Sequence, residues 1–110
     1  MIVEFKKEGK LLIFKLTEDV DQHTSEKIRR KMDNEIKRYI PRKVIFDFSN
    51  ISFMDSAGIG MVLGRYKLAK MLDGELEIIN VNKSMKKIFD MSGVSRIINI
   101  FEEEKNEGVI

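Results

Sequence analysis

The hydrophobic positions of this chain follow two different periods, which alternate from one segment to the next. Short runs rich in β-branched and aromatic side chains predict β-strands. These runs are Ile2–Lys7, Lys10–Leu16, Lys43–Phe48, Glu75–Val81 and a short last one, Ile97–Phe101. The first two flank the turn pair Glu8-Gly9, so they predict a hairpin. In the third run Val44, Phe46 and Phe48 share one face of the strand, and Asp47 lies on the other.

A helix is predicted after the hairpin, where apolar residues recur three or four positions apart. Those residues are Ile28, Met32, Ile36 and Tyr39. Thr24 precedes them and is the predicted N-cap. Pro41 ends the helix, because a proline disfavours the α conformation at the residue before it, here Ile40.

Two more helices are predicted between the later strands. Ser56–Leu72 is the first of them, with Gly74 in the position of a closing C-terminal glycine. Lys83–Met91 is the next, closed in the same way by Gly93. Strands that alternate with helices favour a parallel sheet with helices packed on it. The fold prediction is therefore α/β: a mixed, mainly parallel sheet of four to five strands with about four helices packed on it.

The length of 110 residues predicts one domain, 1–110, whose acidic end, 102–110, is expected to form a frayed tail. The chain has no cysteine and one histidine, His23, so a disulfide framework or a thiolate metal site is excluded, and neither a metal nor a cofactor is expected. A net charge of +2 is too small to indicate nucleic acid as a partner. The apolar stretch Leu11–Phe14 is far shorter than a membrane helix, and the N-terminus lacks a signal peptide, so we expect a cytoplasmic protein.

Ser56 is the main candidate for chemistry, because it stands where a strand and crossover lead into a helix. The start of a helix presents free backbone N–H groups and the positive end of the peptide dipoles. A hydroxyl there acts as an N-cap or as a place where a phosphate is tolerated, and Asp55 competes for the cap. No His, Lys or Arg lies within three residues of Ser56, which disfavours a serine hydrolase.

The glycines of this helix invite a dinucleotide-binding interpretation, which the spacing rejects. The fingerprint needs a glycine three positions after Gly60, where the chain has Leu63. Glycines at a helix start instead permit close approach of another backbone, from the sheet or from a partner. The small residues belong to one of two apolar stripes, which packs on a neighbouring helix or forms a flat docking surface. That stripe is Ala57, Met61, Gly64, Leu68 and Met71.

Three segments resemble one known family when they are taken together. Phe53–Gly60, which reads FMDSAGIG, resembles the phosphorylation segment of the anti-sigma factor antagonists, members of the STAS domain family. Leu63–Lys67 and Ile88–Gly93 resemble its sporulation branch, the antagonists of the anti-sigma-F factor. Asp21–Thr24 is similar to a partner-contacting loop that commonly reads Asp-His-His-Thr, although local sequence alone favours a turn and helix cap. The departures are Gln22, Ala57 where Ser or Thr is frequent, and Glu18-Asp19 where a Gly-Glu pair is usual.

The resemblance implies a binding protein without catalysis of its own, a monomer when free. The unmodified form binds an anti-sigma factor that is itself a serine kinase, and the captive sigma factor is released. The kinase then phosphorylates Ser56, binding ends, and a serine phosphatase restores the cycle. The partner-binding residues implied are Asp21, His23, Thr24, Asp55, Ser56, Ala57, Gly58, Gly60, Met61 and Gly64. The same switch in a general-stress sigma pathway and a nucleotide or small-molecule sensor are the alternatives.

Overall fold

The computed structural model describes residues 1–103 and contains each predicted strand and helix, with ends shifted by a few residues. The elements are β1 (Ile2–Lys6), β2 (Leu11–Lys15), α1 (Gln22–Tyr39), β3 (Lys43–Asp47), α2 (Ser56–Met71), β4 (Glu75–Val81), α3 (Lys83–Ser92), the 3-10 turn η1 (Val94–Arg96) and β5 (Asn99–Glu102). The described residues therefore hold three α-helices and one 3-10 turn, where about four helices were predicted. The α/β class itself is confirmed.

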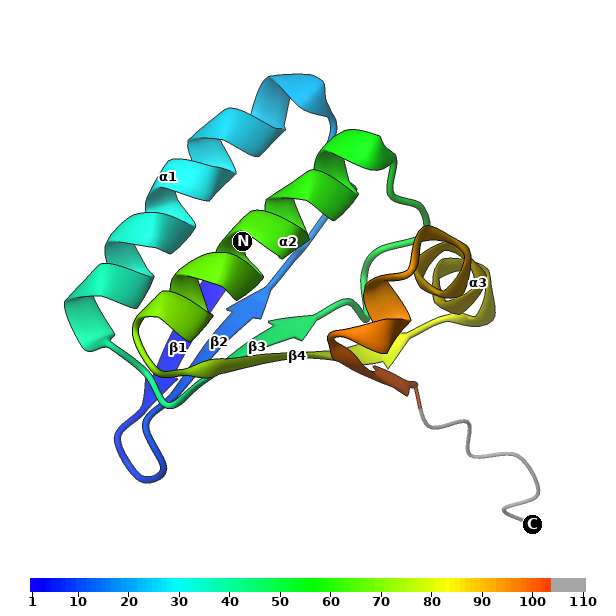
Figure 1. Cartoon of the computed structure of the whole chain (residues 1–110). Coiled ribbons are helices and arrows are strands. Elements are labelled where there is room, and N and C mark those ends of the chain that lie inside the picture. The colour runs from blue at the N-terminus through cyan, green and yellow to red at the C-terminus, as the bar shows by residue number, and fades with distance from the viewer. Residues whose placement is uncertain (104–110) are drawn as a thin grey trace, which may run out of the picture.

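The five strands form one mixed sheet in the order β1-β2-β3-β4-β5. β1 runs antiparallel to β2, and β2 to β5 are parallel. Figure 1 shows α1 and α2 side by side across one face of this sheet, with α3 beyond the far end of β4. Since each parallel crossover is right-handed and adds its strand on the same side, the helices pack against one face.

The core lies between that face of the sheet and the helices. The strand register aligns Phe14, Phe46 and Ile78 in one row across β2, β3 and β4. All three side chains are fully buried. Just past the end of β3, Phe89 of α3 packs on Phe48, with ring centroids 5.8 Å apart. The predicted alternation of β3 is thus confirmed.

The N-terminus of α1 is capped by Asp21, so the prediction of Thr24 as the cap is wrong. The Asp21 carboxylate accepts a hydrogen bond from the Thr24 backbone N–H at 2.9 Å. The Thr24 hydroxyl in turn accepts one from the Asp21 N–H at 3.3 Å, which completes a capping box. The backbone N–H groups of Asp21 and Thr24 are thus both hydrogen-bonded, each by the other residue's side chain. A helix capped by Thr24 would begin later and lose this reciprocal pair of hydrogen bonds. The helix ends before Pro41 as predicted, with Ile40 in a left-handed conformation at φ +44°.

The C-terminus of α2 also differs from its prediction. Asp73, not Gly74, takes the left-handed conformation, at φ +62°. The Gly74 N–H donates to the Ala69 carbonyl at 2.7 Å and the Asp73 N–H to the Lys70 carbonyl at 3.1 Å, the pattern of a Schellman motif. A glycine is required at 74 because a Cβ there would lie 2.7 Å from the Pro41 carbonyl oxygen. Gly93 closes α3 at φ +83°, as predicted.

The beginning of the expected tail belongs to the sheet. Glu102 is the last residue of β5, and the Glu103 N–H donates to the Val81 carbonyl at 3.0 Å. The frayed tail predicted for 102–110 is therefore wrong at its first two residues, and 104–110 lie outside the described part of the chain. No helix within residues 1–103 has both the length and the apolar character needed to cross a membrane.

Candidate functional site

The candidate site lies at the edge of the sheet where the parallel strands end. The loops that follow β2, β3 and β4 meet there, and each leads into the N-terminus of a helix (Figure 1). The carboxyl-end edge of a parallel sheet is where ligands and partners of open α/β folds usually bind. Ser56 is the first residue of α2 at this edge, and its side chain is exposed.

Asp55, and not Ser56, is the N-cap of α2. Its backbone is extended, at φ −91° and ψ −173°, and its carboxylate accepts a hydrogen bond from the Gly58 N–H at 3.1 Å. Of the two interpretations left open by the sequence, the capping role for Ser56 is therefore wrong. Ser56 is exposed, its hydroxyl makes no hydrogen bond within residues 1–103, and it lies at the positive end of the helix dipole, where added negative charge is stabilised.

The loop from β3 to α2 is held in place from both sides. On one side the Asp19 carboxylate accepts from the Ser52 N–H at 2.9 Å and from the Ser52 hydroxyl at 2.8 Å. On the other side the Asn82 side-chain amide donates to the Ile51 carbonyl at 3.1 Å. The hydrogen bond from the Ser52 backbone, followed by that from its hydroxyl, lowers the pKa of Asp19 below its ordinary value. Ser56 is thus presented by a braced loop.

The Asp19–Ser52 hydrogen bonds also bring the two predicted partner-contacting segments together. Asp21, His23 and Thr24 are all exposed and lie at the start of α1, shortly after Asp19. They lie at the same edge of the sheet as Ser56. The capping hydrogen bonds from Thr24, the backbone one first, lower the pKa of Asp21. The loop is therefore both a helix cap and an exposed surface.

Arg29 is a residue near the site that sequence reasoning missed. From α1 its Nη2 donates to the Ala57 carbonyl at 3.1 Å, so a cation lies one residue beyond Ser56. Four residues further along α1, Asp33 pairs with Arg65 of α2 at 2.9 Å. Burial lowers the pKa of the Arg65 guanidinium, opposed by the charge of Asp33. The signal in the sequence was that Arg29 directly follows Ile28 and so borders the buried stripe of α1.

The glycines of α2 have three different surroundings. A Cβ on Gly58 would lie 2.2 Å from Cγ of Met54, so the missing side chain makes room for a buried side chain and not for a backbone. A Cβ on Gly60 would meet Arg29 at 3.7 Å, and one on Gly64 would meet nothing within 4 Å.

Two residues predicted to contact the partner are buried in this conformation. They are Gly58 and Met61, and neither presents a side chain to a partner. Ala57 and Arg65, on the same side of α2 as Met61, contact α1 through its Arg29 and Asp33. The stripe thus packs on the neighbouring helix at this point. Gly60 is exposed, and Asp55, Ala57 and Gly64 are partly buried.

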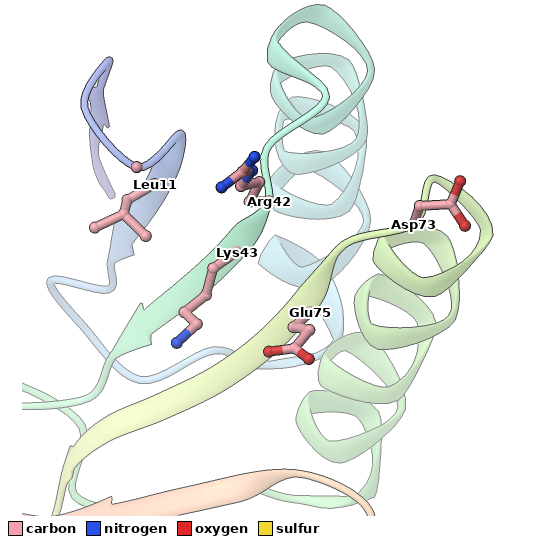
Figure 2. Close-up of a pocket in the computed structure, with 6 residues that line it drawn as sticks. Leu11, Arg42, Lys43, Asp73 and Glu75 are labelled. Carbon is pink, nitrogen blue, oxygen red and sulfur yellow. The ribbon is translucent and has the colours of Figure 1, made fainter.

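A hollow of about 440 Å³ lies at the opposite edge of the sheet, far from Ser56. It is lined by Gly9, Leu11, Arg42, Lys43, Asp73 and Glu75. Figure 2 shows Lys43 and Glu75 projecting from the neighbouring strands β3 and β4. The lining holds two basic and two acidic side chains, and Lys43 already pairs with Glu77 at 3.3 Å, so the charges give a phosphate no net attraction. Among residues 1–103 no group of His, Cys, Asp or Glu side chains is arranged to hold a metal ion.

Residues 3–107 match the STAS domain family, and the chain belongs to that family. The anti-sigma F factor antagonist of Paenibacillus polymyxa is 36% identical over 94% of this chain and 89% of its own length. The anti-sigma-B factor antagonist of Bacillus subtilis is 36% identical over 54% of this chain and 52% of its own. The family resemblance predicted from the motifs is confirmed.

The solved structures of one similar protein agree with this assignment. The unphosphorylated anti-sigma factor antagonist SpoIIAA superposes with a TM-score of 0.75 at 26% identity, over 96% of this chain and 90% of that one. The phosphorylated form of SpoIIAA, described as a Bacillus cell fate determinant, superposes with a TM-score of 0.68 at 27% identity, over 96% and 94%.

Proposed function

We propose that this chain is an anti-sigma factor antagonist whose binding is switched off by phosphorylation of Ser56. The unmodified form binds an anti-sigma factor with serine kinase activity and so releases a sigma factor. The kinase transfers the γ-phosphoryl group of ATP to the Ser56 hydroxyl, and a serine phosphatase removes it. The observation that carries the proposal is the exposed Ser56 side chain, which follows the Asp55 cap and a loop held by hydrogen bonds.

The physics of the site supports a switch that acts on binding and leaves the fold intact. A phosphate adds about −1.5 to −2 charges at neutral pH. At the start of α2 these charges meet the helix dipole favourably, by roughly 0.3–1 kcal/mol. A charge left without a partner in a docked interface costs about 2–5 kcal/mol, or roughly 30-fold to several thousand-fold in affinity. The interface effect is the larger, and the existence of SpoIIAA in a phosphorylated form with a similar fold agrees with this balance.

The role of substrate and binding partner also fits the surroundings of Ser56 better than catalysis does. Arg29 is a cation that the fold brings to the start of α2, and a guanidinium has hydrogen-bond donors but no acceptor. It cannot serve as the base that a serine nucleophile requires. A hydrolase would reveal itself by turnover of activated esters that is lost in Ser56→Ala.

The test is phosphorylation in vitro, with the anti-sigma F factor of Paenibacillus polymyxa as the kinase. The chain is incubated with that factor and Mg-ATP, and its peptides are mapped by mass spectrometry. We expect one phosphate, on Ser56, and none in Ser56→Ala. Ser52 is the internal control, because its hydroxyl is held by Asp19. Phosphate on Ser52, or a phosphate that persists in Ser56→Ala, contradicts the assignment.

Within this proposal the sporulation pathway of sigma F is favoured over a general-stress pathway of sigma B. The similarity to the anti-sigma F antagonist extends over 94% of the chain, whereas that to the anti-sigma-B antagonist of Bacillus subtilis extends over 54%. Parallel binding measurements with an anti-sigma F and an anti-sigma B factor distinguish the two pathways. Calorimetry of the free chain with ATP and GTP tests the alternative of a nucleotide sensor, for which we expect no heat of binding.

A further inference from the structure

Phe53 is a large apolar side chain held in solvent three residues before Ser56. It is 59% exposed, although Ile51 and Met54 on either side of it are 3% and 1% exposed. Phe53 is the first residue of the segment that resembles the phosphorylation segment, but it is not among the residues that the resemblance assigns to partner binding. The exposed ring contributes little to the hydrophobic core, because most of its apolar surface stays in water after folding.

The exposure of Phe53 follows from a fixed backbone. The preceding residue, Ser52, is hydrogen-bonded through both its N–H and its hydroxyl to Asp19, and the carbonyl of Ile51 accepts from Asn82. On the other side Asp55 is fixed as the cap of α2. With its flanking residues anchored in this way, the backbone that carries the ring is held in place, and little backbone freedom remains to be lost when a partner covers the ring.

The position of the ring connects the two parts of the proposed binding surface. Ser56 lies on its C-terminal side, and Asp19 ties its loop to the exposed segment that begins at Asp21. Another exposed aromatic ring, that of Phe101, is 50% exposed but belongs to β5, outside these two segments. Aromatic residues surrounded by polar contacts are typical of the centre of protein interfaces.

We infer that Phe53 is the apolar anchor of this surface and inserts into a hydrophobic pocket of the anti-sigma factor, with Asp19 as the residue that positions it. The inference rests on the proposed function. It adds that Phe53 makes an apolar contact with the partner. It also adds that the partner has an apolar pocket adjacent to the site that receives the Ser56 hydroxyl.

The absence of tryptophan from the chain allows a direct test. Phe53→Trp places a single fluorophore at the proposed anchor, and Phe101→Trp is the matched control on β5. Each variant is titrated with the anti-sigma F factor of Paenibacillus polymyxa, and the spectrum of that factor with the parental chain is subtracted. We expect the emission of the Phe53→Trp variant to shift to shorter wavelength on binding and that of the Phe101→Trp variant to stay unchanged. An indole spectrum of Phe53→Trp that stays solvent-like at saturation overturns the inference.

Affinity measurements give the second, independent readout. We expect Phe53→Ala to weaken binding at least tenfold and Phe53→Leu to recover part of the loss, with Phe101→Ala within twofold of the parental chain. Asp19→Ala should weaken binding severalfold and Glu18→Ala should not, because Glu18 makes no such contact with the loop in the described hydrogen bonds. If the parental chain binds and Phe53→Ala binds equally well, the anchor is wrong and the proposed function stands. If the parental chain neither binds nor accepts phosphate, the proposed function itself fails.

Discussion

Beside the candidate site, Met54 occupies the space that a side chain at position 58 would need, which makes a sharp prediction for Gly58→Ala. The added Cβ would lie 2.2 Å from Cγ of Met54, 2.8 Å from its Sδ and 3.2 Å from its Cε. The first of these atoms is close to the Met54 backbone, and the side chain is 1% exposed, so rotation into solvent cannot relieve the clash. The Met54 side chain or the first turn of α2 has to move.

The expected magnitude follows from two opposing effects. Forcing an extra carbon into a packed core costs about 1–3 kcal/mol. Alanine is intrinsically better than glycine in a helix by about 0.5–1 kcal/mol. We therefore expect Gly58→Ala to lower the free energy of unfolding by up to about 2.5 kcal/mol, with a central value of about 1 kcal/mol. Gly64→Ala in the same helix is the matched control, because nothing lies within 4 Å of its added Cβ, and it should raise stability by about 0.5–1 kcal/mol.

The assay is urea denaturation of both single variants, of Met54→Ala and of the double variant. Met54→Ala removes the three atoms that the new Cβ would meet, so the cost of Gly58→Ala should vanish in that background. The reasoning is refuted if Gly58→Ala is as stable as Gly64→Ala. It is also refuted if the two substitutions at 58 and 54 are simply additive.

Four further predictions concern caps, charge and backbone strain. Ser56→Asp should lower affinity for the anti-sigma factor at least tenfold with a nearly unchanged melting temperature, and a drop of tens of degrees in a thermal melt would contradict this. Asp21→Ala should lower the free energy of unfolding by about 0.5–2 kcal/mol through loss of the α1 cap, whereas Asp21→Asn keeps the cap. Equal stability of these two variants in urea would exclude the capping role. Ile40→Gly should raise the free energy of unfolding by about 0.5–1 kcal/mol in the same assay, because a β-branched residue at φ +44° is strained and this side chain is 52% exposed. A loss of stability would show that the strain is absent. The pKa of the Asp19 carboxyl is lowered in the folded chain. The ionised carboxylate therefore contributes stability above its ordinary pKa of 3.8, and this contribution is lost as the pH falls through the lowered pKa. Urea midpoints measured stepwise below pH 3.8 should fall less in Asp19→Asn than in the parental chain.

The helices and strands could be predicted because the information for each lies within a few neighbouring residues. Alternation over β3 and helical spacing over α1 were sufficient to orient Val44, Phe46 and Ile36 toward a core, where they are fully buried. The position of Ser56 at a helix start is equally local. Helix ends were harder to predict, because Asp21 and Thr24 are both good caps three residues apart, and the choice between them depends on the reciprocal hydrogen bonds that each can complete.

The surroundings of Ser56, in contrast, depend on residues far away in the chain. Arg29 reaches Ala57 across 28 positions of sequence, and Asp19 reaches Ser52 across 33. These contacts exist because β2 pairs with β3 in parallel, which brings the loops after both strands to one edge and lays α1 beside α2. Residue periodicity reports which face of an element is buried, but not which element lies against it. Local sequence was therefore enough to place a serine at the start of a helix, whereas the braced loop, the neighbouring arginine and the exposed ring of Phe53 emerge only once the chain is folded.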